Sequence, residues 1–356
     1  MKESKKKLLL TGGGTAGHVT PHLALIPLLE ADFEIYYIGS RKGIEKNLIE
    51  AQGIPYKGIS VGKLRRYFSW ENLKDAFRVL RGTAQAYFYI RRLQPDVLFS
   101  KGGFVAVPVV LGAKLNRVPI VCHESDLTPG IATKISAKFA QKVCTTFEDC
   151  AKYFGSRGVY TGTPLRASLF AGSAARARQK YSLRGKPILL IMGGSQGALA
   201  VNNAIHEIVD RLLPTFDILH LCGENKRNAA LNNKPGYVQI EYLNEELADA
   251  LTAADIVISR AGSNSISELN ALKKPMLLIP YPAAQVSRGD QILNAKYYQK
   301  LGLAHMLMQK DITPDRLYDE IMLLYEQRDT LRQRLEEQGI ENGAERVCQI
   351  IRAAAE

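Results

Sequence analysis

The stretch "LLLTGGGTAGHVTPHLAL", Leu8 to Leu25, decides how the rest of the chain is interpreted. A short apolar run ends in the pattern Gly12-x-Gly14-x-x-Gly17, and His18 follows directly. Glycines in this spacing, between a strand and a helix, allow a tight turn whose backbone N–H groups can approach an anion. We therefore expect a β-strand, a glycine-rich turn and a helix start, which together form the first unit of a Rossmann-like fold.

The same letters are compatible with other nucleotide sites. A phosphate-binding P-loop needs Lys-Ser or Lys-Thr after its last glycine, and this chain has His18-Val19, so the P-loop is set aside. A Rossmann site for NAD places an acid at the end of the second strand, but "YYIGSRKG" contains Arg41 and Lys42 instead. These cations suit a 2′-phosphate, so an NADP-dependent oxidoreductase stays the second candidate. A tight turn that binds no ligand is the structural alternative.

Short apolar runs alternate with longer helical patterns along the chain. The runs are continuous, as expected for parallel strands that are buried on both faces. We therefore predict an α/β fold with doubly wound parallel sheets. The predicted strands lie at 7–11, 34–39, 96–100, 119–123, 187–192, 216–222, 255–259 and 275–280, and the clearest predicted helices at 72–92, 198–213 and 288–300.

The length and an internal repetition indicate two domains. A domain averages about 150 residues, and the chain has 356. The segment 168–187 is polar and basic, and after it "PILLIMGGSQGALA" repeats the strand–glycine pattern of the opening stretch. Each half also carries a second glycine motif, "DVLFSKGGFVAVP" and "DIVISRAGSNSISE". We expect similar domains at 1–163 and 164–337, with ligands at the carboxyl ends of their strands and the binding faces opposed across a cleft.

Composition excludes several classes of protein. The five cysteines form no CxxC pair, so a disulfide framework or a zinc ribbon is not expected, and a reducing cytoplasm fits. The N-terminal apolar run is too short for a signal peptide, and no stretch approaches the roughly 20 apolar residues of a membrane span. The net charge of +12 points to an anionic partner. A nucleic-acid binder would show a recognisable binding module or aromatic platform, and neither is evident.

Polar residues of the second half point to a nucleoside diphosphate. Ser195 follows a predicted strand and can donate to a phosphate, and the hydroxyl residues from Ser263 onward leave helix N–H groups open to a diphosphate. Glu268 can accept hydrogen bonds from both hydroxyls of a ribose, although it also fits an ordinary solvated helix position. Gln291 and Asn294 lie one helical turn apart on one face, a pattern that by itself also fits a polar surface.

Six ordered motifs resemble those of the MurG family of glycosyltransferases: "GGGTAGH", "HESD", "TGTPLR", "GGSQGA", "RAGSNSISE" and "GDQILNA". The resemblance covers essentially the whole chain. It implies a GT-B fold of two Rossmann-like domains, with a last helix at 338–356 that packs back on the first domain. It also implies transfer of N-acetylglucosamine, with inversion, from UDP-N-acetylglucosamine to an undecaprenyl-pyrophosphoryl-muramyl-pentapeptide, and neither cofactor nor obligatory metal.

The resemblance also assigns roles to individual positions. Arg166 is expected to bind the donor, Leu243 to pack near the uracil, and Gln291 to contact the sugar. Asp126 stands where many members carry Asn, and it can accept from sugar hydroxyls but cannot donate an amide N–H. The implied substrate-binding residues are Thr15, Ala16, Gly17, Asp126, Arg166, Ser195, Leu243, Ser263, Asn264, Ser265, Ile266, Ser267, Glu268 and Gln291; those on the acceptor side are Gly13, Gly14, Gly102, Gly103 and Asn294.

The implied reaction needs a base and a site for the leaving group. A sugar hydroxyl is a weak nucleophile, and a nearby base contributes typically 10²–10⁴-fold. His18 opens the helix at the reacting face, and an imidazole can accept a proton near neutral pH. A capping or acceptor-binding histidine is the alternative. Glu124 is the rival base, unless it braces its own loop. The diphosphate of the leaving UDP would be stabilised by helix N-terminal N–H groups and Ser195.

A lipid-linked acceptor implies that this chain docks on the cytoplasmic face of the membrane as a peripheral protein. The best stretch is "GKLRRYFSW", Gly62 to Trp70, with the helix up to Arg92 behind it. Basic residues attract anionic headgroups and aromatic rings favour the interfacial zone. The alternative is a solvated basic loop whose aromatic rings pack into the first domain. The residues expected to face the membrane are Lys63, Arg65, Arg66, Phe68 and Trp70.

Overall fold

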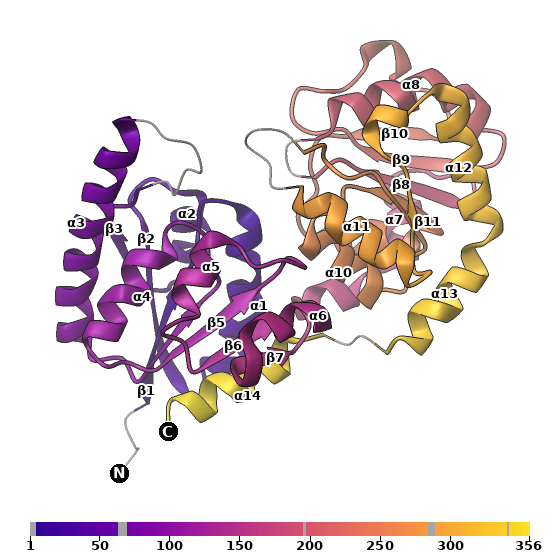
Figure 1. The fold of residues 1–356 in the computed structure, drawn as a ribbon. Helices are drawn as coiled ribbons and strands as arrows, with labels where there is room; N and C mark the ends of the chain where they lie inside the picture. Colours follow the sequence, from indigo (N-terminus) through magenta and orange to yellow (C-terminus); the bar gives the residue numbers. More distant parts are fainter. Residues whose placement is uncertain (1–4, 63–69, 195–196, 284–288, 340–341) are drawn as a thin grey trace. The chain divides into compact units, whose positions relative to one another are not determined.

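The computed structural model describes residues 5–62, 70–194, 197–283, 289–339 and 342–356. The chain divides into two compact units, which are described separately below (Figure 1). Unit 1 comprises residues 1–166 and 342–356, and unit 2 comprises residues 167–341. The domain boundaries expected from the sequence are 163/164 and 337/338. They lie a few residues before those of the structure, 166/167 and 341/342.

Unit 1 is built on a parallel sheet with the strand order β3-β2-β1-β4-β5-β6-β7. Leu8 pairs with Ile35 on one side and with Val97 on the other, so β1 lies at the centre. The strands are β1 Lys6–Thr11, β2 Phe33–Ser40, β3 Tyr56–Ile59, β4 Val97–Ser100, β5 Ile120–Glu124, β6 Lys142–Thr145 and β7 Gly158–Tyr160.

Helices cover both faces of this sheet. Leu8 and Leu10 pack with residues of α1 and α14, whereas Leu9 between them packs with α3 and α4. Because successive side chains of a strand point to opposite faces, a continuous apolar run is what a sheet covered on both sides requires. The helices of unit 1 are α1 Thr20–Leu29, α2 Ile44–Glu50, α3 Trp70–Leu93, α4 Ala106–Leu115, α5 Ile131–Ser136, α6 Glu148–Ala151 and α14 Ala344–Ala354, with 3₁₀ turns at Ala16–His18 and Lys152–Arg157.

Unit 2 repeats the plan with a parallel sheet of order β10-β9-β8-β11-β12-β13. Its strands are β8 Ile188–Met192, β9 Asp217–Leu221, β10 Tyr237–Ile240, β11 Ile256–Ser259, β12 Met276–Leu278 and β13 His305–Met306. Its helices are α7 Ala174–Lys180, α8 Leu199–Leu212, α9 Leu247–Ala253, α10 Ser263–Ala271, α11 Asp290–Lys300, α12 Pro314–Glu326 and α13 Arg328–Glu337, with 3₁₀ turns at Ala167–Ala171, Ala229–Leu231 and Gln309–Asp311.

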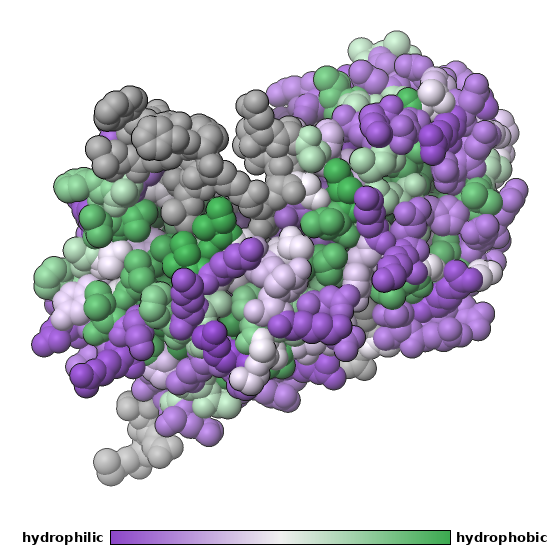
Figure 2. Space-filling view, viewed as in Figure 1, coloured by the Kyte–Doolittle hydropathy of each residue, from purple (hydrophilic) through white to green (hydrophobic). Residues whose placement is uncertain are grey.

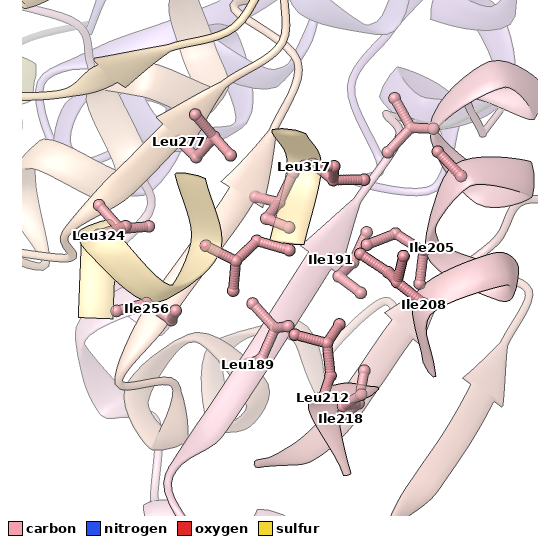
Figure 3. Packing of buried hydrophobic residues seen from close by; sticks show 14 of the residues in the cluster. Leu189, Ile191, Ile205, Ile208, Leu212, Ile218, Ile256, Leu277, Leu317 and Leu324 are labelled. Carbon is pink, nitrogen blue, oxygen red and sulfur yellow. The ribbon is translucent and has the colours of Figure 1, made fainter. Parts of the chain in front are cut away.

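One face of the second sheet packs against α8 and α12. Leu189 and Ile191 of β8 meet Ile205 and Ile208 of α8, and Leu317 of α12 closes the same cluster (Figure 3). All five side chains are fully buried. The alternate residues Ile188 and Leu190 are buried as well, so this sheet too is enclosed on both sides.

The structure confirms the predicted fold class of two Rossmann-like parallel-sheet domains. All eight predicted strands are present, and the three clearest predicted helices are α3, α8 and α11. The segment 168–187, expected to be a polar break, instead carries α7, which belongs to unit 2. Arg176 of α7 forms a bidentate pair with Asp249 of α9, through N–O distances of 2.9 and 2.6 Å.

Candidate functional site

The first site lies where the strand order of unit 1 reverses. β1 is bordered by β2 and β4, and the loops after β1 and β4 diverge at their carboxyl ends. Open α/β sheets bind ligands at such a switch point. Both predicted glycine motifs of the first half, residues 12–17 and 102–103, are in these two loops.

The two glycine loops touch backbone to backbone. Gly14, Gly102 and Gly103 have φ values of 90°, 83° and 79°, which favour glycine. A Cβ on Gly103 would lie 2.3 Å from the Gly13 carbonyl oxygen and 3.3 Å from His18 Nδ1. Any side chain at Gly103 would therefore separate the loops and displace His18.

His18 ends the 3₁₀ turn after the first glycine loop. Its backbone N–H donates to the Thr15 carbonyl at 3.1 Å, and its ring Nδ1 lies 2.9 Å from the Thr15 hydroxyl oxygen. His18 as a whole is partly buried. Two contacts to one residue hold the imidazole in a defined orientation at the junction of the two loops.

The backbone beneath the loop is held by buried aromatic and histidine side chains. The Tyr37 hydroxyl donates to the Gly12 carbonyl at 3.0 Å and lies 3.2 Å from His22 Nδ1. Burial lowers the pKa of His22 to about 3, and the neighbouring charges of Lys101 and His18 add to the effect. His22 is therefore neutral at physiological pH and serves as a packing residue.

A buried carboxylate that the sequence analysis did not single out occupies one side of the glycine loop. Glu45, on α2, accepts hydrogen bonds from the Ser40 N–H at 2.9 Å, the Ser40 hydroxyl at 2.5 Å and the Gly14 N–H at 3.4 Å. A Cβ on Gly13 would lie 2.6 Å from Glu45 Cδ. In the sequence Glu45 resembles an ordinary first-turn acid, because only the fold shows that it points inward.

Glu124 ends β5 and holds the loop that follows it. One carboxylate oxygen accepts from the N–H groups of Ser125 and Asp126 at 2.9 and 3.1 Å, and the other accepts from Gly130 N–H at 3.0 Å. Its side chain is buried. This is the bracing arrangement that the sequence left open, and it holds the turn that carries Asp126 by hydrogen bonds at both ends.

Lys101, at the end of β4, was not predicted as a site residue. Its side chain is only 2% exposed and donates to the Ser125 hydroxyl. Burial lowers the pKa of Lys101 to about 8, against the opposing attraction of Glu124 and Asp126. A buried cation thus lies behind the loop that carries Asp126.

Two hollows open beside the first glycine loop. The larger, of about 800 Å³, runs from Gly14 and Phe104 to Arg41, Lys42 and Arg78. The smaller, of about 570 Å³, shares Arg78 with it and continues along α3. Arg78 pairs with Asp75 at 2.9 Å.

The second site lies at the corresponding switch point of unit 2. β8 is bordered by β9 and β11, and the motifs "GGSQGA" and "RAGSNSISE" follow β8 and β11. Ser195 lies outside the described residues. A Cβ on Gly197, where φ is 68°, would lie 2.0 Å from the Cys222 carbonyl oxygen. Glycine here lets the loop after β8 pass close to the end of β9.

The segment predicted to form a diphosphate loop, Ser263 to Ser267, is the beginning of α10. The Ile266 N–H donates to the Gly262 carbonyl at 3.0 Å, and the Ile266 side chain is fully buried. The Ser267 hydroxyl donates to the Ser263 carbonyl at 2.8 Å. An anion here would therefore meet the first helical turn, Ser263 to Ser265, rather than the whole segment.

The other predicted donor residues of unit 2 occupy different environments. Glu268 is partly buried on α10, and Leu243, after β10, is buried. Gln291 accepts from the Tyr281 N–H at 2.9 Å through its side-chain oxygen. Asn294, expected on the acceptor side, is fully buried in unit 2 and donates to the Ala261 carbonyl at 3.2 Å, so it supports the loop after β11.

Arg260, which the sequence analysis did not single out, supports the loops at this switch point. Its guanidinium donates to the Ile279 carbonyl at 3.0 Å and to Gln309 Oε1 at 2.7 Å. It lies over the Tyr281 ring, 5.6 Å from the centroid, and burial lowers its pKa. Arg260 thus ties the loops after β11 and β12 together. Arg166, the remaining predicted donor residue, is partly buried at the last position of the first segment of unit 1.

The predicted membrane stretch is largely outside the described residues. Lys63, Arg65, Arg66 and Phe68 are not described, and Trp70 begins α3 without a described side chain. Farther along α3, one side carries three large exposed apolar residues, and Figure 2 shows hydrophobic side chains gathered over this part of unit 1. They are Phe77, Leu80 and Phe88, 69%, 68% and 69% exposed.

Across the described ranges, no helix has the length and apolar character needed to cross a bilayer. Within the same ranges, no group of three or more His, Cys, Asp or Glu side chains is arranged to hold a metal ion.

Family models match both units of the chain. The glycosyltransferase family 28 N-terminal domain matches residues 8–145, and the glycosyltransferase family 28 C-terminal domain matches residues 188–349. The chain belongs to glycosyltransferase family 28. It is therefore a hexose-transferring enzyme of the predicted class, and the oxidoreductase alternative falls.

Similar proteins agree with this family. A protein of Clostridium tetani is 48% identical over 98% of both chains, and one of Geobacillus kaustophilus is 49% identical over 99% of both. Each is named UDP-N-acetylglucosamine–N-acetylmuramyl-(pentapeptide) pyrophosphoryl-undecaprenol N-acetylglucosamine transferase. The crystal structure of Acinetobacter baumannii MurG, 25% identical, superposes with a TM-score of 0.78 over 98% of this chain and 99% of that one. The predicted family is confirmed.

Proposed function

We propose that this chain transfers N-acetylglucosamine from UDP-N-acetylglucosamine to undecaprenyl-pyrophosphoryl-N-acetylmuramyl-pentapeptide. The observation that carries the proposal is full-length similarity, at 48–49% identity, to enzymes named for this reaction. The paired glycine loops support it, because a transferase needs a donor site and an acceptor site and each sheet offers one site at its switch point.

The donor binds to unit 2 in this proposal. The first turn of α10 and the loop after β8, with Ser195, receive the diphosphate, because N–H groups of a helix start stabilise an anion. Glu268 accepts the ribose hydroxyls, Leu243 packs near the uracil, and Gln291 and Arg166 contact the rest of the donor. The same N–H groups stabilise UDP as it leaves.

The acceptor sugar reacts at the switch point of unit 1, between the glycine loops. We assign the base to His18 and a bracing role to Glu124, whose carboxylate oxygens already accept three backbone N–H groups. For His18 to take a proton at Nε2, Nδ1 must carry the other proton and donate it to the Thr15 hydroxyl, and their separation of 2.9 Å allows this. Asp126 accepts from the transferred sugar.

The lipid part of the acceptor requires the chain to work at a membrane surface. We propose peripheral docking on the cytoplasmic face through the exposed apolar side of α3 and the basic stretch that precedes it. Arg81 and Arg92 are exposed on the same helix as Phe77 and Phe88, and cations beside apolar rings suit an anionic lipid surface. Nucleic acid is not a partner in this proposal.

The decisive experiment measures transfer directly. The purified chain is incubated with UDP-N-acetylglucosamine and the polyprenyl-linked acceptor, and the disaccharide product is quantified. A thermal-shift series with UDP, UDP-N-acetylglucosamine, NADP and an oligonucleotide accompanies it. We expect product formation and stabilisation by the two uridine nucleotides only. No product with a correctly folded chain, or stabilisation by NADP alone, would contradict the proposal.

A further inference from the structure

A carboxylate of the neighbouring helix α2 already lies against the first glycine loop. Glu45 accepts the Gly14 N–H at 3.4 Å, and its carboxylate lies against Gly13 and Gly43, where a Cβ would come within 2.6 and 2.1 Å of carboxylate atoms. These glycines are therefore explained by the close approach of Glu45. A second anion at the same place would meet like-charge repulsion inside a partly buried site.

Positive charge lies in the adjoining hollow instead. Arg41, Lys42 and Arg78 line the cavity of about 800 Å³ that begins at Gly14 and Phe104. The only carboxylate among its described lining residues is Asp75, which pairs with Arg78 and is 5% exposed. The open wall of the cavity thus presents the cations. The volume of the cavity lies within the range of small-molecule sites.

The hollows also connect the reacting loop with the apolar side of α3. The smaller cavity shares Ser60 and Arg78 with the larger one and adds Lys74, Arg81 and Phe77. Phe77 begins the exposed apolar row that continues through Leu80 to Phe88. Along unit 1 the order is therefore glycine loop, basic cavity and apolar helix face.

We propose that the diphosphate of a polyprenyl diphosphate acceptor binds in this basic cavity, against Arg41, Lys42 and Arg78, rather than in the glycine loop. The acceptor has the same order of parts as the protein surface: a reacting sugar, a diphosphate and an apolar chain. The sugar then lies at the glycine loops beside His18, and the lipid leaves over α3. This inference rests on the proposed function.

The test compares a cavity variant with a charge-matched control. The double variant Arg41→Gln/Lys42→Gln removes two exposed cations of the cavity. The control Lys46→Gln/Lys57→Gln removes two cations of the same unit that do not line it, one with a side chain 44% exposed and one classed as exposed as a whole residue. Transfer is measured in neutral detergent, which removes attraction to anionic headgroups. Two acceptors are used: the natural diphosphate-linked one, and one whose diphosphate is replaced by an uncharged linker of equal length.

The cavity variant is expected to raise KM for the diphosphate-linked acceptor by about 10- to 100-fold, the loss of a charged hydrogen bond. KM for UDP-N-acetylglucosamine, and KM for the uncharged acceptor, should stay within about twofold of wild type. An equal rise for both acceptors would assign the cations to another part of the acceptor, and no rise beyond that of the control would remove them from the site. Activity of wild type with either acceptor tests the proposed function separately.

Discussion

Lys101 carries a positive charge into the interior of unit 1. Its ammonium reaches the Ser125 hydroxyl and lies within the field of Glu124 and Asp126. Because Glu124 fixes the N–H groups of this loop and Lys101 holds a hydroxyl of it, the loop is tied from two sides. The position of Asp126 therefore depends on two residues that are themselves buried.

The buried lysine makes stability depend on pH. The pKa of Lys101 is about 8 in the folded chain against 10.5 for an ordinary lysine, so between these values the unfolded chain binds more protons and stability rises with pH. Comparison with Lys101→Met isolates this contribution. From pH 7.5 to pH 9.5, the free energy of unfolding measured in urea should rise by about 2 kcal/mol more for wild type than for the variant.

An exposed lysine serves as the control. The free energy of unfolding of Lys46→Met should change with pH as that of wild type does, because the Lys46 side chain is 44% exposed. If the unfolding free energy of Lys101→Met also changed with pH as that of wild type does, Lys101 would not be buried as an ammonium.

His18 is expected to act on turnover rather than on nucleotide binding. His18→Ala should lower the single-turnover rate by about 10²–10⁴-fold, the usual contribution of a general base, and leave the Kd for UDP unchanged in calorimetry. Thr15→Val, which removes the hydroxyl beside Nδ1, should cause a smaller loss. An intact single-turnover rate for His18→Ala at saturating acceptor would take His18 out of the mechanism.

Glu268, unlike His18, is expected to act on nucleotide binding. Glu268→Ala should weaken UDP binding by about 1.5–3 kcal/mol, the contribution of a charged hydrogen bond, which isothermal calorimetry measures directly. Glu241 is an acid of the same unit that pairs with Arg227 and is partly exposed, and Glu241→Ala should bind UDP as wild type does. Unchanged affinity in Glu268→Ala would leave the ribose carboxylate unassigned.

At the scale of elements, four of the five described strands that the sequence missed share one property. β3, β7, β10 and β13 are the edge strands of the two sheets, and β6 adjoins β7. An edge strand has fewer neighbours, so its residues are partly exposed, as in β7, where all three are intermediate. Their apolar runs are short or interrupted, and hydrophobic continuity, which revealed all eight predicted strands, is weak there.

The positions of the glycine loops could be predicted from the sequence, whereas the side chains that support them could not. Glycine motifs after strands are visible in the letters, so the loops at both switch points were found. The supporting side chains Glu45, Lys101 and Arg260 were not, because each has an ordinary letter at an ordinary position. Their roles come from burial and from partners 5 to 49 residues away in the chain, which only the fold brings together.

The helix α3 has one face that is buried and one that is exposed. Gly82, Ala86 and Ile90, spaced by four residues, are buried toward the sheet, and a Cβ on Gly82 would lie 2.0 Å from the Ser60 carbonyl oxygen. Phe77, Leu80 and Phe88 follow helical spacing on the exposed side. Exposed apolar residues in such a row mark an interaction surface.

Removing that row should weaken membrane binding without affecting the nucleotide. Phe77→Ser/Leu80→Ser/Phe88→Ser is expected to reduce sedimentation with anionic vesicles at low salt, and to leave UDP affinity as in wild type. Binding of wild type should also fall as salt rises, because the Debye length shortens from about 10 Å at 0.1 M to about 3 Å at 1 M. Equal vesicle binding by variant and wild type would place the membrane face elsewhere, for instance on Phe68 and Trp70.

At the scale of the whole molecule, the chain crosses from unit 1 to unit 2 and returns. The return is fixed by Asn342, whose side chain accepts from the Leu165 N–H at 2.8 Å and donates to the Leu165 carbonyl at 2.7 Å. α14 then packs on α1 within unit 1 (Figure 1). Arg352 pairs with Asp32 at 2.8 Å and donates to the Leu28 carbonyl at 2.8 Å. Residues more than 300 positions apart thus complete one unit.

Ending the chain after Glu341 should therefore damage unit 1 and spare unit 2. Val347, Cys348 and Ile351 are fully buried in the core of unit 1. Each large apolar side chain contributes about 1.5–3 kcal/mol, so their loss removes much of the 5–15 kcal/mol typical of a domain. Calorimetry should show the transition of unit 1 at a much lower temperature. The transition of unit 2 should keep its midpoint temperature and should still be raised by UDP.

The control for this truncation is Arg352→Ala, which removes only the polar contacts at the end of α14 and should lower the unit 1 transition by a smaller amount. Coincident melting of the truncated and complete chains would mean that α14 adds nothing to unit 1, and a loss of UDP stabilisation would mean that unit 2 depends on it.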